Sequence, residues 1–312
     1  MEQGIALSPS GAHSQHDTRY VDEFSITELV NRQIAATAPQ RLADIVTALT
    51  RHLHDFAREV RLSENELMAA IQFLTQVGQT CNDKRQEFIL LSDVLGLSML
   101  VTAQNNRKPQ GCTESTVFGP FHVENSPEHA MGDDIANGAP GEPCFVRGVV
   151  RGLGGEPVAN ARIEVWQADE DGFYDVQYDG MDQARARATL RTGPDGAYRF
   201  RSILASSYPI PHDGPVGKLL AALGRHPWRP AHLHFLIKAE GYETLITHVF
   251  RNGDHYLDSD AVFGVRQSLI ADWVRHPAGP GPDGRLLTAP FYTLDFDFAL
   301  NPLPGDPCTA RT

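Results

Sequence analysis

Two histidines separated by one residue, His232 and His234, form the most chemically pointed pair in the sequence. Alternate side chains of a β-strand point to the same face, so a strand here would aim both imidazoles at one point and Leu233 at the opposite layer. Imidazole nitrogens commonly bind transition metals. The pair therefore predicts part of a metal site, although two histidines on one strand face can also be ordinary surface or core residues.

Two tyrosines that precede the histidine pair are further candidates. Tyr174 lies in the segment Asp-Gly-Phe-Tyr-Asp and Tyr208 in Ser-Ser-Tyr-Pro-Ile-Pro, both of which are typical of loops. A loop tyrosine usually packs its ring and leaves its hydroxyl in water. Neither tyrosine indicates a metal site alone, so the hypothesis depends on the whole set.

The order and spacing of three short segments resemble the iron signature of the intradiol ring-cleaving dioxygenases. These segments are Gly172-Phe173-Tyr174, Tyr208-Pro209 and Arg229-Pro230-Ala231-His232-Leu233-His234. The similarity extends from about residue 90 to residue 298. The resemblance implies an enzyme that uses O2 to cleave an aromatic diol between its two hydroxylated carbons.

The resemblance also implies one Fe(III) per subunit, completed by water or hydroxide and bound by Tyr174, Tyr208, His232 and His234. A free phenol has a pKa of about 10, but a trivalent cation favours the phenolate. Two phenolates in turn stabilise ferric over ferrous iron. Such a set differs from zinc sites and from the two-histidine, one-carboxylate set of Fe(II) oxygenases.

Two residues of the signature are expected to be catalytic. Tyr208 would leave the metal when the diol binds and act as a base, while Arg229 would stabilise negative charge on the substrate. Arg229 could instead be a surface residue in front of a proline. His248 occupies a position where the catechol-cleaving members carry a glutamine, and it would either orient a reactant or hydrogen-bond a ligand.

Three further segments, residues 90–96, 113–121 and 165–178, resemble the family members that cleave hydroxyquinol (benzene-1,2,4-triol) to 3-hydroxy-cis,cis-muconate, the enol of maleylacetate. Asp93 would accept a hydrogen bond from the third hydroxyl, a contact that discriminates against diols without it. Asp93 could instead be an exposed helix residue. The alternative substrates are catechol and chlorocatechols, and the alternative of another class is a non-catalytic β-sandwich binding module.

The resemblance predicts the walls of the substrate pocket as well. Most of these residues are apolar, and each could equally belong to the core. As a set they are expected to surround an aromatic ring beside the iron. They are Leu90, Asp93, Val117, Phe118, Gly119, Pro120, Phe121, Ile210, Pro211, Arg229 and Val262.

The first hundred or so residues are predicted to be helical. Ser25 with Glu28, and Ser63 with Glu66, have the spacing of capping boxes and predict two helix starts. Apolar residues recur at intervals of three and four over residues 42–62, 67–77 and 88–101.

The composition changes after residue 106 to glycine, proline and short alternating segments. Gly154-Gly155 and Pro194-Asp195-Gly196 predict tight turns between strands. The predicted strands are residues 145–150, 162–166, 197–201, 233–238, 245–250 and 292–298.

The expected fold class is α+β but mostly β, with an antiparallel β-sandwich catalytic domain and an N-terminal helical domain. Residues 1–20 are expected to be a mobile arm, residues 21–106 a helical linker and dimerisation domain, and residues 107–312 the sandwich. The resemblance implies a homodimer through the helices, with a phospholipid bound at the interface. A helical lid packed only on its own sandwich is the alternative.

Composition argues against several kinds of partner. The 312 residues have a formal net charge of −12, which repels nucleic acids and anionic membranes. No apolar run approaches the ~20 residues of a membrane span, and no export signal is evident. The dispersed cysteines form no CxxC pair. We therefore expect a soluble cytoplasmic enzyme without nucleic-acid or membrane partners.

Overall fold

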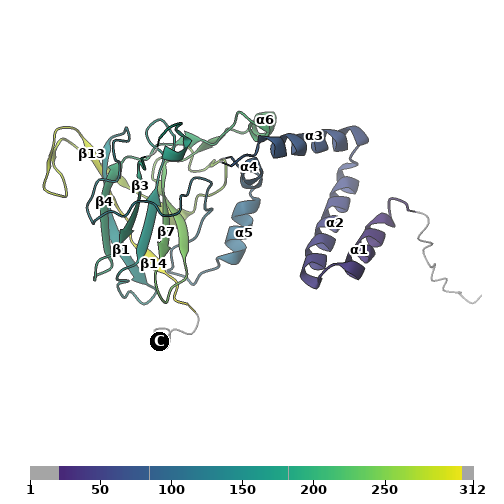
Figure 1. The fold of residues 1–312 in the computed structure, drawn as a ribbon, viewed down its shortest axis with the longest axis horizontal. Helices are drawn as coiled ribbons and strands as arrows, with labels where there is room; N and C mark the ends of the chain where they lie inside the picture. The colour runs from purple at the N-terminus through teal and green to yellow at the C-terminus, as the bar shows by residue number, and fades with distance from the viewer. Residues whose placement is uncertain (1–20, 84, 182, 304–312) are drawn as a thin grey trace, which may run out of the picture. The chain divides into compact units, whose positions relative to one another are not determined.

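The computed structural model describes residues 21–83, 85–181 and 183–303. The expected mobile arm at residues 1–20 lies outside this range. The chain forms two compact units, Met1–Gln72 and Phe73–Thr312. The first unit is helical and the second contains the sheets (Figure 1). This division precedes the composition change at residue 106 because two further helices belong to the second unit.

The first unit contains α1 (Ile26–Thr37), α2 (Gln40–Val60) and the start of α3 (Glu64–Thr80). The predicted capping box at Ser63 is confirmed. The Ser63 N–H donates to Glu66 Oε2 at 2.8 Å, and the Glu66 N–H donates to Ser63 Oγ at 3.3 Å. These bonds satisfy amides that have no partner within the helix.

The predicted capping box at Ser25 is wrong. The Asp22 carboxylate accepts the Ser25 N–H at 2.7 Å, and the Ser25 side chain makes no cap bond. Glu28 instead pairs with Arg32 on the exposed helix surface at 2.7 Å. The aspartate therefore forms a local turn that competes with the expected cap.

One face of α2 carries a row of apolar side chains at intervals of three and four. Each of these six side chains is 48–55% exposed. A contiguous exposed apolar surface of this kind is typical of an interaction site. We call this set the α2 stripe, and its members are Leu42, Ile45, Leu49, Leu53, Phe56 and Val60.

Two helices, α4 (Glu87–Val94) and α5 (Leu97–Asn105), replace the single helix predicted over residues 88–101. Gly96 between them has a φ of +75°, a left-handed conformation that ends the helix. Among the described residues, no single helix has the length and apolar character to cross a membrane. Among these residues, the pair α4 and α5 is long and apolar enough when the two helices are counted as one segment. The chain bends by 77° between them.

The second unit contains two five-stranded sheets. One has the order β3 (Arg187–Arg191), β2 (Arg162–Trp166), β7 (His232–Lys238), β8 (Leu245–Arg251) and β9 (Ile270–Ala271). The other is formed by β10 (Trp273–His276), β13 (Phe291–Asp295), β1 (Pro143–Gly152) and β14 (Phe298–Leu300), with β4 (Ala197–Ile203) also paired to β1. The shorter elements are η1 (Asp175–Gln177), β5 (Tyr208–Pro209), α6 (Pro215–Ala222), β6 (Trp228–Arg229), η2 (Gln267–Leu269), β11 (Gly279–Pro280) and β12 (Leu286–Leu287).

The expectation of a purely antiparallel architecture is wrong, because both sheets are mixed. β1 runs parallel to β13 and β14, and β8 runs parallel to β9. Side-chain alternation indicates which residues share a face but not the direction of the neighbouring strand. All six predicted strands form, although the last is divided into β13 and β14. The remaining strands are short and had no matching prediction: β3, β5, β6, β9, β10, β11 and β12.

Both sheets contribute to one hydrophobic cluster. β1 and β4 supply Val146 and Phe200, while β2 and β7 supply Ile163 and Phe235. Each of these side chains is at most 2% exposed, and burial of each stabilises the fold by about 1.5–3 kcal/mol. Leu233 joins the same cluster, which leaves the opposite face of β7 for the histidines.

Candidate metal centre

The second face of β7 carries His232 and His234, as the alternation predicts. The neighbouring strands place two more rings beside them: β2 pairs Trp166 with His234, and β8 pairs His248 with His234. The Trp166 ring stacks on the His234 imidazole, with centroids 4.7 Å apart and planes inclined by 15°. His234 is therefore held by contacts from both adjoining strands.

A loop after β2 and the short strand β5 bring two tyrosines to the same place. Gly172 in this loop has a φ of +84°, and a Cβ atom there would lie 2.8 Å from Tyr208 Cβ. Only glycine therefore permits this approach of the loop to β5. Tyr174 follows in the chain, and the adjacent Asp175 forms a buried ion pair with Arg187 of β3 at 2.6 Å.

Four side-chain donor atoms converge between these elements. Tyr174 Oη lies 2.8 Å from His234 Nε2 and 3.2 Å from Tyr208 Oη. His232 Nε2 lies 3.2 Å from His234 Nε2. Ligand atoms bound at about 2 Å to one metal ion are spaced in this way. All four side chains are at most 5% exposed, so the residues fit a metal ion shielded from bulk water.

Both imidazoles can direct a lone pair toward this point. His232 Nδ1 donates to the Pro230 carbonyl at 2.7 Å, which leaves Nε2 unprotonated. Burial, together with the nearby Arg229 charge, lowers the pKa of His232 to about 3, and burial holds the pKa of His234 well below its usual value. Burial also raises the pKa of Tyr174 well above its usual value. This phenol therefore needs a cation to become a phenolate.

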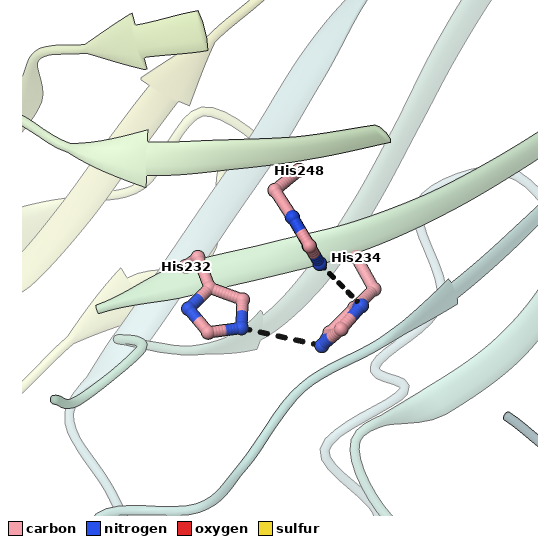
Figure 2. A group of neighbouring side chains, drawn as sticks. All are labelled: His232, His234 and His248. Carbon is pink, nitrogen blue, oxygen red and sulfur yellow. Dashed lines mark hydrogen bonds between the residues drawn. The ribbon is translucent and has the colours of Figure 1, made fainter. Parts of the chain in front are cut away.

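A second possible ligand set consists of three histidines. Ring nitrogens of His232, His234 and His248 lie within 4.8 Å of one another, and Figure 2 shows their hydrogen-bonded arrangement on β7 and β8. However, His248 Nε2 lies 2.8 Å from His234 Nδ1, whereas Tyr174 and His232 approach Nε2 of the same ring. The geometry favours the two tyrosines and two histidines, because their donor atoms share one point.

Arg229 lies beside the four donor atoms in a buried ion pair. Its Nη1 is 3.3 Å from His232 Nε2, and its Nε donates to Asp260 Oδ1 at 3.1 Å. The Asp260 carboxylate also accepts the N–H groups of Val262 and Gly264. Burial opposes ionisation of both partners, but their mutual attraction lowers the pKa of Asp260 and raises that of Arg229. Arg229 is only 3% exposed, so the alternative of a surface arginine is wrong.

Asp93 on α4 is buried, at 5% exposed, which contradicts the alternative of an exposed helix residue. Burial raises the pKa of its carboxyl, although a hydrogen bond from Ser98 and the charge of Arg229 oppose that shift. Four predicted wall residues are buried together in one hydrophobic cluster with Val94 of α4: Leu90, Val117, Ile210 and Val262.

The segment from Phe118 to Phe121 lies against the proposed ligands. Gly119 has a φ of +77°, and a Cβ atom there would lie 3.1 Å from His234 Cε1. The Phe121 ring stacks on Tyr174, with centroids 4.5 Å apart. Phe118 and Pro120 are exposed, and Pro211 is half-buried. Gly119 and Phe121 thus support the proposed metal ligands directly, in addition to any contact with substrate.

Three residues of the site were not among the predicted site residues, although Trp166 and Thr116 lie within segments that carry the family resemblance. Asp260 reaches Arg229 across 31 positions, and Trp166 reaches His234 through strand register. Thr116 Oγ1 lies 2.5 Å from His248 Nδ1. Pairing of distant segments creates these contacts, so periodicity along the chain could not have indicated them.

Comparison with known proteins shows the family. Residues 117–302 match the family model described as "Dioxygenase", and residues 39–113 match "Catechol dioxygenase N terminus". The chain therefore belongs to the intradiol ring-cleaving dioxygenases, as the sequence resemblance predicts, and is an enzyme of that family. Members of the family are Fe(III)-dependent.

Two relatives and one solved structure are similar to this chain over most of its length. The chain is 62% identical to 6-chlorohydroxyquinol 1,2-dioxygenase of Cupriavidus pinatubonensis, over 90% of this chain and 98% of that protein. It is 56% identical to hydroxyquinol 1,2-dioxygenase of Nocardioides simplex, over 90% of this chain and 96% of that protein. The structure of hydroxyquinol 1,2-dioxygenase from Pseudomonas putida DLL-E4 is similar with a TM-score of 0.85 and 42% identity, covering 90% and 99% of the two chains.

Proposed function

We propose that this enzyme cleaves hydroxyquinol with O2 between two adjacent hydroxylated carbons to 3-hydroxy-cis,cis-muconate, the enol of maleylacetate. Both atoms of O2 enter the product, so no external reductant is needed. The convergence of two phenol oxygens and two imidazole nitrogens at one buried point carries the proposal. Two of the relatives above are named for hydroxyquinol and one for 6-chlorohydroxyquinol, which supports a benzene-1,2,4-triol as the substrate.

The proposed cofactor is one Fe(III) per chain, held by Tyr174 Oη, Tyr208 Oη, His232 Nε2 and His234 Nε2. Two anionic oxygens suit a hard trivalent cation, and two neutral imidazoles complete the protein ligands. Bound Fe(III) would act as a Lewis acid that favours loss of protons from the substrate hydroxyls, and the resulting anionic ring would be more readily oxidised by O2.

We assign different roles to the two tyrosines. Tyr174 is fully buried, stacks on Phe121, and is next to the Asp175–Arg187 ion pair. Tyr208 lies on a two-residue strand and is slightly exposed. The less constrained Tyr208 would move away as the substrate arrives, and its phenolate oxygen would accept a proton from a substrate hydroxyl.

Arg229 and Asp93 would recognise the polar groups of the substrate. The Arg229 guanidinium, fixed by Asp260, would stabilise negative charge on the ring oxygens. The Asp93 carboxylate would accept a hydrogen bond from the third hydroxyl. The proposed apolar walls are Leu90, Val117, Phe118, Gly119, Pro120, Phe121, Ile210, Pro211 and Val262.

We also propose a homodimer that forms through the helical region of residues 21–106, with residues 107–312 as the catalytic domain. The exposed α2 stripe supports this proposal, because apolar surface in water favours association. The stripe extends over a 21-residue helix, roughly 30 Å long. An acyl chain of a phospholipid would fit along such a surface between two copies.

The proposed catalytic domain is a sandwich of two mixed sheets. One hydrophobic cluster receives side chains from both sheets, which supports face-to-face packing. We place the enzyme in the cytoplasm, and the unpaired Cys81, Cys112 and Cys144 of the described chain are consistent with a reducing compartment.

The substrate is tested by comparing kcat/KM for hydroxyquinol, catechol and chlorocatechols with iron-loaded protein. We expect the highest value for hydroxyquinol. A higher kcat/KM for catechol or a chlorocatechol would show that this compound, rather than hydroxyquinol, is the preferred substrate. Absence of ring cleavage with every diol, in protein that contains iron, would contradict the proposed reaction.

The ligand set is tested by iron content and visible absorption, because phenolate bound to Fe(III) absorbs visible light. His232→Ala and His234→Ala should each lose most of the iron and the colour. His129→Ala, which replaces a half-buried histidine outside the site, is the matched control and should retain both. Normal iron content in His232→Ala or His234→Ala would remove that residue from the ligand set.

A further inference from the structure

His248 lies within the site but outside the four proposed ligands. It is fully buried, on β8. Its Nδ1 lies 2.5 Å from Thr116 Oγ1, and its Nε2 lies 2.8 Å from His234 Nδ1. Both nitrogens of the His248 ring are therefore engaged by protein groups, and the bond to His234 is visible in Figure 2.

The hydrogen bonds from Thr116 through His248 to His234 permit two arrangements of protons. In one, Thr116 donates to His248, His248 donates to His234 Nδ1, and His234 Nε2 carries a proton. In the other, His234 Nδ1 donates to His248 Nε2, and His248 Nδ1 donates to Thr116 Oγ1. Only the second arrangement leaves a lone pair on His234 Nε2, which a metal ligand requires.

We infer that His248 is a positioning residue, which accepts the Nδ1 proton of His234 and so holds that ring in the tautomer that binds iron. Thr116 fixes His248 in turn by accepting its Nδ1 proton. This inference rests on the proposed iron site. A group that accepts the second N–H of a ligating histidine sets the ring orientation and makes the ring a stronger ligand.

Burial makes this hydrogen bond difficult to replace. His234 and His248 are at most 2% exposed, so bulk water cannot reach the Nδ1–H of His234 if His248 is removed. His234 would then keep an unpaired buried N–H or move its proton to Nε2, and either outcome disfavours the metal. Trp166 stacks against the ring, which limits rotation toward another acceptor.

Three substitutions in the full chain separate this role from others. His248→Gln keeps an acceptor for His234 and a donor for Thr116 on one side chain. His248→Leu fills space but removes both functions. Thr116→Val preserves shape and removes only the distal hydroxyl. Each variant is compared with wild type for Fe(III) affinity in competition with a chelator, for the energy of the phenolate-to-iron visible band, and for the Tm of the iron-free protein.

We expect His248→Leu to weaken Fe(III) binding by about 10- to 100-fold and to shift the visible band. Thr116→Val should have a smaller effect in the same direction, and His248→Gln should stay within about tenfold of wild type. If His248→Leu lowers the Tm of iron-free protein but leaves iron affinity and band energy unchanged, the role is only structural and the inference is overturned.

Two further outcomes are distinguishable from these. Loss of iron in His248→Gln as complete as in His234→Ala would make His248 a ligand and overturn the inference. If His248→Leu does not fold, Thr116→Val and His248→Gln still test the inference. Wild-type Fe(III) affinity and band energy in Thr116→Val, together with a large loss of Fe(III) affinity in His248→Gln, would contradict the proposed hydrogen bonds from Thr116 through His248 to His234. Wild-type protein that binds no iron would contradict the proposed function instead.

Discussion

Tyr174 and Tyr208 contribute the same functional group but are held differently by their neighbours. Tyr174 is stacked on Phe121 and lies next to a buried ion pair, whereas Tyr208 belongs to a two-residue strand. A ligand that must leave the metal needs room and mobility, while a permanent ligand benefits from restraint. The surroundings of the two rings therefore predict distinct consequences of the same substitution.

Tyr208→Phe should retain part of its iron, because three proposed ligands persist, and its visible band should shift. Its kcat should fall by at least about 100-fold, since a positioned base contributes roughly that factor, while KM changes much less. Tyr174→Phe, the matched substitution, should lose more iron. Steady-state kinetics and iron content are the measurements, and a near-normal kcat in Tyr208→Phe would show that Tyr208 is not the departing base.

Asp93→Asn should alter substrate preference without altering iron content. A hydrogen bond to a charged group contributes about 1–3 kcal/mol, so kcat/KM for hydroxyquinol should fall roughly tenfold to a hundredfold relative to catechol. Catechol lacks the third hydroxyl and cannot use the contact. Equal losses on both substrates would mean that Asp93 serves the fold rather than recognition.

The same substitution should stabilise the protein at neutral pH. Burial raises the pKa of Asp93 above its usual value, so the folded state carries a charged carboxylate at a cost when the pH is above that pKa. Below about pH 3.8, the usual value, the carboxyl is protonated in both states and the cost disappears. Denaturant unfolding of Asp93→Asn should therefore show a gain at pH 7 that shrinks as the pH falls toward 4, and a gain independent of pH would refute this cause.

The loop from Asp260 to Gly264 is organised by a single carboxylate. The Asp260 carboxylate accepts hydrogen bonds from Arg229 of β6 and from two N–H groups of its own loop, including that of Val262. Phe263 in this loop has a φ of +58°, which is uncommon for a bulky residue. One side chain therefore couples the position of the proposed catalytic cation to a predicted wall of the substrate pocket.

Asp260→Asn should lower the free energy of unfolding by about 3–5 kcal/mol, because it leaves the buried Arg229 without a counter-charge. The matched control is Asp295→Asn, which breaks a pair with Arg147 whose side chains are about 60% exposed. Exposed pairs contribute at most about 1 kcal/mol. Denaturant titration of iron-free protein measures both losses, and similar losses in the two variants would contradict a structural role for the buried pair.

At the scale of the whole molecule, the α2 stripe is one of several apolar surfaces that remain exposed in the single chain. Apolar side chains at helical spacing usually face a core, yet these six remain about half exposed. Association with a second copy would remove them from water. The proposed homodimer is therefore supported by the free-energy cost of exposing these apolar side chains to water, as well as by the family resemblance.

Leu49→Glu and Phe56→Glu should each shift the protein toward monomer, because a charge on the α2 stripe would be desolvated in the interface. Arg51→Glu, on the exposed face of the same helix opposite the stripe, is the control for added negative charge, and it should preserve the dimer. Analytical ultracentrifugation over a range of concentrations measures the equilibrium. Identical association of all three variants and wild type would place the interface elsewhere.

Local pattern was sufficient to predict much of the fold and the shared strand face of His232 and His234. The spacing of His232 and His234 placed both rings on one face of β7 because side chains alternate along any strand. Strand β2 formed at the predicted residues, and the Ser63 capping box formed because both partners lie within one helical turn. Such features depend on neighbours in sequence, so the sequence by itself determined them.

Other features depend on segments that meet only after folding. The parallel pairing of β1 with β13 and β14 joins strands from distant parts of the second unit. The loop that contains Asp260 brings its carboxylate to Arg229, and the register of β7 and β8 places His248 beside His234. Residue patterns show which face a side chain occupies but not which distant chain segment lies beside it. Only the tertiary structure could therefore decide the charge partner of Arg229 and the hydrogen-bond partner of His234.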